Sequence, residues 1–129
     1  MSRAEEAAQR AALAAAKDQA ESREAQRLID DFVREARARR LAPEPLRATL
    51  YGGQQVRTDR SGWYLRQNKS LAIGEDGGYY VLTIPGGLRE RLTGAQLTPK
   101  PPPLELGRGG RDGETGDLAE FLRVRLEAG

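Results

Sequence analysis

The sequence contains no cysteine and no histidine, and these two absences exclude much of the common chemistry of protein sites. Without cysteine the chain forms no disulfide, zinc–thiolate site or iron–sulfur cluster, and it has no thiol nucleophile. Without histidine it lacks the usual general base near neutral pH and the commonest metal ligand. We therefore expect no metal, no cofactor and no small-molecule substrate, and we expect that the protein is not an enzyme.

Long apolar runs are also missing, since no stretch approaches the roughly 18 residues of a membrane-spanning helix. The opening residues carry no apolar core of a secretory signal, so we expect no membrane association and a cytoplasmic location. Arginine outnumbers lysine 18 to 3, and alanine, glycine and leucine are abundant. All four favoured residues have GC-rich codons, which indicates a bacterial origin.

Net charge is small overall but unevenly distributed along the chain. The formal net charge is +2. Residues 1–46 carry nine basic and nine acidic side chains, residues 47–111 carry ten and five, and residues 112–129 carry two and five. A basic middle and an acidic end either neutralise each other within the fold or face separate partners.

Residues 1–42 predict a helical arm. The first 27 residues hold only two large apolar side chains, Met1 and Leu13, among good helix formers without glycine or proline. A 3-4 spacing of mostly alanine runs from Ala4 to Ala36 and permits a coiled coil. We expect residues 1–27 to be largely solvated, with self-association through this helix as the alternative.

Beyond residue 27 the pattern indicates one buried helix face. Leu28, Ile29, Phe32 and Val33 recur at the spacing of an amphipathic helix and form a candidate helix interface. Pro43 and the second proline that follows it are expected to end the helix near residue 41.

Residues 46–129 predict a small domain, which makes the protein α+β. Short strands are expected at 48–51, 54–58, 62–66, 70–73 and 79–84, separated by glycine-rich turns and curled into an antiparallel meander or roll. Five of the seven aromatic residues lie between Tyr51 and Tyr80, so the core is expected there. A short helical turn is expected at 88–92 and a last edge strand at 104–106. A C-terminal helix capped by Asp117, with Glu120 as its capping-box partner, is expected to pack on the sheet.

The glycine-rich run from Gly107 to Gly116 is the one stretch that resembles a phosphate cradle. Its spacing fails, because Asp112 stands where the dinucleotide pattern needs glycine and no Gly-Lys-Ser/Thr ending follows. We interpret the run as a connector that leads into the C-terminal helix.

Basic and aromatic residues of the predicted meander form a candidate macromolecule-binding surface. Strand alternation predicts that Tyr64, Arg66 and Tyr79 share the outer sheet face, with Arg57, Arg60 and Lys69 in neighbouring strand ends or turns. Such a face can stack bases and hold phosphates. Alternatively, the two tyrosines form an ordinary cross-strand pair and the arginines are solvated cover.

The sequence thus predicts a small, non-catalytic macromolecular interaction module. A protein partner or self-association is the favoured hypothesis, because a long polar helix carries one apolar stripe at its end and no catalytic set is present. Nucleic-acid binding through the basic, aromatic face of residues 47–111 is the alternative.

Overall fold

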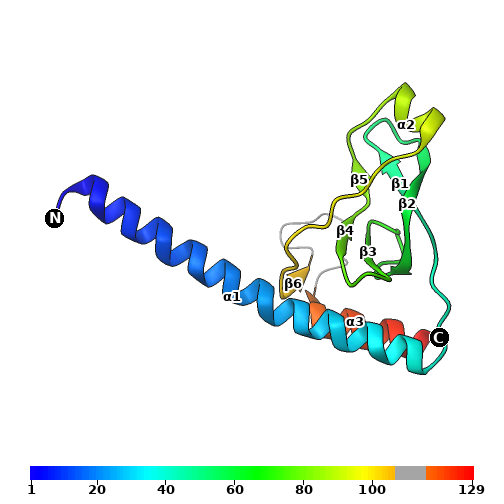
Figure 1. Ribbon diagram of the computed structural model, residues 1–129, viewed down its shortest axis with the longest axis horizontal. Coiled ribbons are helices and arrows are strands. Elements are labelled where there is room, and N and C mark those ends of the chain that lie inside the picture. Colours follow the sequence, from blue (N-terminus) through cyan, green and yellow to red (C-terminus); the bar gives the residue numbers. More distant parts are fainter. Residues whose placement is uncertain (107–115) are drawn as a thin grey trace.

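The structure, a computed structural model, describes residues 1–106 and 116–129 of the chain. A long helix and a shorter helix lie side by side under a small curled sheet (Figure 1). This arrangement confirms the predicted α+β fold with a C-terminal helix on the β unit. The elements are α1 (Arg3–Ala38), β1 (Glu44–Leu50), β2 (Gln55–Tyr64), β3 (Leu71–Gly74), β4 (Tyr79–Val81), β5 (Thr83–Ile84), α2 (Leu88–Thr93), β6 (Glu105–Leu106), β7 (Gly116–Asp117) and α3 (Leu118–Ala128).

Local interactions define both ends of helix α1. The Ser2 side chain accepts a hydrogen bond from the Glu5 amide at 3.1 Å, as a helix N-cap does. At the other end Arg40 adopts a left-handed backbone with φ of 57°. The Leu41 amide then bonds to the Ala36 carbonyl at 2.9 Å, which makes a Schellman turn. The helix therefore ends at Ala38 through this turn, before the chain reaches Pro43.

Only the C-terminal half of α1 packs on the rest of the protein. Ala25, Ile29, Phe32 and Ala36 are buried, whereas residues 1–20 are exposed throughout. Figure 1 shows this N-terminal part of the helix, residues 3–20, extending away from the sheet; we call it the projecting segment. The contact with the rest of the protein begins at Glu21, whose Oε1 accepts a hydrogen bond from the Leu104 amide at 3.0 Å. The docked part of the helix therefore begins earlier than the boundary near residue 27 that the sequence indicates.

The sheet closes on itself to form a small barrel. Its strand order is β4-β3-β2-β1-β5, antiparallel except for the parallel pair of β1 and β5. The two outer strands are consecutive in the chain and are separated only by Leu82. The Leu82 amide bonds to the Ser70 carbonyl at 2.9 Å, and its carbonyl accepts the Thr49 amide at 2.7 Å. One stretch of chain thus joins both edges, which confirms the predicted roll and adds a parallel contact to it.

Strand β2 is continuous where the sequence predicts two strands. Its pairing with β1 jumps from Pro45 opposite Ser61 to Arg47 opposite Arg57, so β2 bulges between these positions. The Thr58 hydroxyl donates to the Leu46 carbonyl at 2.7 Å and occupies a backbone acceptor at the bulge. Polar residues that look like a turn in the sequence therefore bend one long strand.

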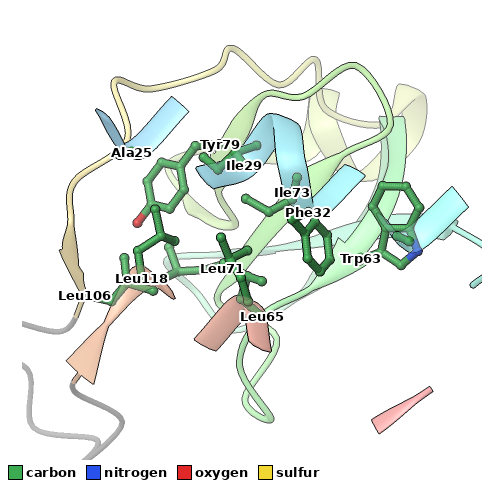
Figure 2. Close-up of a cluster of buried hydrophobic side chains, with 12 residues drawn as sticks. Ala25, Ile29, Phe32, Trp63, Leu65, Leu71, Ile73, Tyr79, Leu106 and Leu118 are labelled. Carbon is green, nitrogen blue, oxygen red and sulfur yellow. The ribbon is translucent and has the colours of Figure 1, made fainter. Parts of the chain in front are cut away.

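Both faces of the barrel wall are apolar, and each face lines its own cluster. The interior cluster consists of Leu46, Ala48, Leu50, Val56, Ala72, Tyr80, Leu82, Ala95 and Leu97. The outer cluster joins the wall to the helices (Figure 2), and its members include Ile29, Phe32, Trp63, Leu65, Leu71, Ile73, Tyr79, Leu106, Leu118 and Leu122. The Phe32 and Trp63 rings meet edge to face, with centroids 5.6 Å apart.

The two shorter helices follow the expected positions. Helix α2 ends at Gly94, which has φ of 84°, and lies at the end of the barrel away from α1 (Figure 1). Asp117 occupies the N-cap position of α3, as predicted, but its side chain makes no capping bond. The predicted capping box is therefore wrong, because the Glu120 carboxylate pairs with Arg123 instead. The predicted connector falls outside the described residues except for Gly116.

We predict that a substitution in the docked half of α1 lowers the stability of the protein much more than one in the projecting segment. Ile29→Ala should lower the free energy of unfolding by about 2–5 kcal/mol, because it leaves a cavity between α1 and the barrel. Leu13→Ala should change it by less than about 0.5 kcal/mol at low protein concentration, since Leu13 is 72% exposed. Urea unfolding of both variants measures the difference. Similar losses would show that the projecting segment packs on the body.

Candidate functional site

The candidate helix interface is used within the chain itself. Ile29 and Phe32 lie in the outer cluster with 0% and 2% of their surface exposed. Leu28 and Val33 are partly buried and pack against the same cluster. The prediction of a buried helix face is confirmed, and its partner is the barrel wall together with α3.

The predicted common face of Tyr64, Arg66 and Tyr79 is wrong, because the two tyrosines lie on opposite sides of the barrel wall. Tyr79 is 6% exposed and belongs to the outer cluster (Figure 2). Tyr64 packs against the interior cluster, and its hydroxyl accepts the Arg47 amide at 2.8 Å. Burial raises the pKa of Tyr79 above its ordinary value, even though the Arg66 charge acts in the opposite direction.

The reason for this error is that strand alternation identifies a polar face only when one face is solvated. Here α1 and α3 cover the outer face, so consecutive residues Tyr79 and Tyr80 are both buried. The alternative, a direct pair between Tyr64 and Tyr79, is not formed either, since their strand partners are Ala72 and Ile73.

The predicted basic residues contact different neighbours within the chain. Lys69 lies over the Tyr64 ring, with its Nζ 5.3 Å from the centroid, and Arg66 lies over the Phe121 ring at 6.0 Å. Arg57 reaches the Leu92 carbonyl at 3.5 Å. Arg57 and Lys69 remain exposed, whereas Arg60 and Arg66 are half-buried. The structure thus shows several separate local contacts rather than one stacking platform.

Arg60 takes part in a polar cluster at the turn between β3 and β4. Its guanidinium lies 3.3 Å from Asp76 Oδ2, which also accepts the Tyr80 hydroxyl at 2.6 Å. The other carboxylate oxygen accepts the Gly78 amide at 2.9 Å. These bonds join the turn to a buried tyrosine, so the cluster stabilises the hairpin.

Within this cluster the pKa of Asp76 is lowered and the pKa of Tyr80 is raised. Partial burial alone would raise the pKa of Asp76, but the bonds from Tyr80 and Gly78 and the Arg60 charge together lower it. Burial, the bond to Asp76 and the charge of that carboxylate raise the pKa of Tyr80 to about 12. Both groups therefore keep their ordinary charge states at neutral pH.

A groove between α1 and α3 is the surface feature that sequence reasoning missed. It measures about 350 Å³. Its lining consists of Leu28, Asp31, Phe32, Glu35, Ala119, Leu122, Arg123 and Leu126. We call it the α1–α3 groove. The apolar stripes of the two helices are visible in the sequence, but only their side-by-side placement creates a groove with an acidic rim on α1.

The projecting segment is the second feature of interest. Its side chains are exposed on all sides, and Leu13 is its one large apolar residue. It carries three basic and three acidic residues, so its net charge is zero.

The described residues contain no group of three or more His, Cys, Asp or Glu side chains that could hold a metal ion. Within the same residues, no helix combines the length and apolar character needed to cross a membrane. Comparison of the chain with protein-family models, with curated proteins and with solved structures finds no match.

We predict that the Asp76 cluster contributes to stability in a pH-dependent way. Asp76→Asn should destabilise the protein by about 1 kcal/mol at neutral pH, since the carboxylate is partly exposed. Because folding lowers the pKa of Asp76 below 3.8, its contribution is present above that pH and is lost as the pH falls below it. The difference between wild type and variant should therefore shrink on acidification, as measured by urea unfolding between neutral and strongly acidic pH. Parallel stability curves would contradict this assignment.

Proposed function

We propose that the protein is a non-catalytic protein-interaction module that binds a protein partner through the projecting segment. The observation that carries this proposal is that residues 3–20 form helix without any packing on the described parts of the chain. These residues continue the docked half of α1, so they stay helical without burying any side chain of their own, and their surface remains exposed for a partner. A long, exposed helix is a common form in which one protein presents side chains to another.

The charge of the projecting segment favours a protein partner over a nucleic acid. Arg3, Arg10 and Lys17 are balanced by three acidic residues. A helix that binds DNA or RNA gains most of its affinity from excess positive charge on phosphates. Zero net charge supplies little of that attraction, whereas helix–helix contacts between proteins tolerate mixed charges.

Nucleic-acid binding by the basic middle of the chain stays the second candidate and has less support. Its stacking pair, Tyr64 and Tyr79, is divided between two faces of the barrel wall. Of its cations, Arg60 lies over the Tyr80 ring and beside Asp76. These contacts lower the positive charge available to phosphates at that position.

We predict that the projecting segment, not the far end of the barrel, cross-links to protein. A photoreactive phenylalanine analogue at Leu13 should give protein adducts in cells that make the full chain. The same analogue at Leu92 is a matched control, because the two leucines are 72% and 68% exposed and Leu92 lies on α2. Gel shifts followed by mass spectrometry identify the adducts. Equal labelling at the two positions would contradict the proposal, and adducts that disappear with nuclease would favour the nucleic-acid alternative.

A further inference from the structure

We propose that the partner of the projecting segment is a second copy of this chain. The two α1 helices lie antiparallel, and the projecting segment of each copy covers the α1–α3 groove of the other. This inference rests on the proposed function, in which the projecting segment binds protein, and it adds the identity of the partner.

A stripe of residues runs along one side of α1. Arg10, Leu13 and Lys17 are spaced by three and four residues, as are Leu28, Asp31 and Glu35. Leu28 follows Lys17 by eleven positions, which is about three helical turns, so both triplets lie on the same side of the helix. We call this the lateral stripe. Its second triplet lines the α1–α3 groove.

The lateral stripe is distinct from the side of α1 that packs on the barrel. The residues of α1 that pack on the barrel are Ala25, Ile29, Phe32 and Ala36. At 3.6 residues per turn, the centre of this set lies about 100° around the helix axis from the centre of the stripe. A helix can therefore cover the stripe without displacing the barrel.

The two ends of the stripe carry complementary charges. The stripe is basic in the projecting segment, at Arg10 and Lys17, and acidic in the docked half, at Asp31 and Glu35. Glu24, seven residues after Lys17 and seven before Asp31, lies in line with the stripe between its two triplets. A two-fold axis between residues 20 and 21 of two antiparallel helices places Arg10 opposite Asp31 of the other copy. The same axis places Lys17 opposite Glu24. A parallel arrangement would instead place like charges opposite each other.

The acidic residues of the stripe are available for such pairing. Asp31 contacts Arg34, Glu24 contacts Arg27 and Glu35 contacts Arg39, each within one turn of α1. All these side chains are at least 45% exposed. Ion pairs of this kind contribute only about 0.2–1 kcal/mol, so the carboxylates can accept a second cation at little cost. At the outer end of the contact Glu6 faces Glu35, whose charge Arg39 offsets.

The apolar surfaces of the two copies also match in this arrangement. The same axis places Leu13 opposite Leu28, at the mouth of the groove formed with Phe32, Leu122 and Leu126. Leu13 is the one large apolar side chain of residues 2–20. The projecting segment and the groove lie on the same side of α1. A two-fold axis therefore places the projecting segment of each copy on the groove of the other, and the lateral stripes of both copies are paired along their length.

We predict that the full chain is a dimer that dissociates when Leu13 is truncated. Leu13→Ala should raise the dimer dissociation constant at least about 100-fold, since the leucine is buried in two symmetric contacts. Leu92→Ala is the control and should leave the constant unchanged, because Leu92 lies on α2 at the far end of the barrel. Sedimentation equilibrium over a range of concentrations measures the constants. Circular dichroism checks that both variants stay folded.

A charge-reversal series tests the antiparallel arrangement directly. Arg10→Glu with Lys17→Glu should dissociate the dimer, and so should Glu24→Arg with Asp31→Arg. The four substitutions together should restore it, because each reversed pair again has opposite charges. Arg23→Glu, on another side of the same helix, is the control and should have no effect.

The outcomes separate this inference from the proposed function. A wild-type chain that is monomeric at about 100 µM overturns the second-copy proposal. A dimer that is unaffected by Leu13→Ala, or that the four combined substitutions fail to restore, does so as well. In those cases the proposed function still stands if Leu13 cross-links to another protein. It fails if Leu13 cross-links to no protein.

Discussion

The packing of α1 on the outer face of the barrel is the contact on which the rest of the structure depends. A barrel this small has an interior that accepts few side chains, and its strands also place large apolar residues outside. Trp63, Ile73 and Tyr79 would be exposed to water without a cover. Ile29 and Phe32 of α1 supply that cover, and α3 completes it with Leu118 and Leu122.

This contact also explains how the projecting segment can be helical. The unfavourable step in helix formation is the first turn, whereas each further residue adds a hydrogen bond at little cost. Packing on the barrel fixes the C-terminal half of α1, and the alanine-rich N-terminal half extends a helix that already exists. The Ser2 cap then satisfies an amide at the free end. The segment therefore needs no contact of its own in order to present its side chains in a defined order.

Much of the fold could be predicted from the sequence where the signal is local. The glycine-rich turn between β1 and β2, helix α2 with its cap at Gly94 and the buried face around Phe32 depend on neighbouring residues. The parallel contact of β1 with β5 could not be predicted, because it depends on hydrogen bonds from Leu82 to residues that are distant in sequence. The sides of the sheet on which Tyr64 and Tyr79 lie could not be predicted either, because this also depends on tertiary placement. Only the packing of α1 makes the outer face of the barrel wall part of a core.

The candidate site shows the same division between local pattern and tertiary placement. The alanine spacing that begins at Ala4 has the same phase as the docked residues Ala25 and Ile29, which suggests an alanine-rich coiled coil. Alanine buries little apolar area, so this phase gives the projecting segment little affinity for anything. Leu13 lies on a different side of the helix, in line with the residues of α1 that line the α1–α3 groove. The proposed recognition by α1 thus rests on its exposed leucine and the charges around it rather than on its most regular repeat.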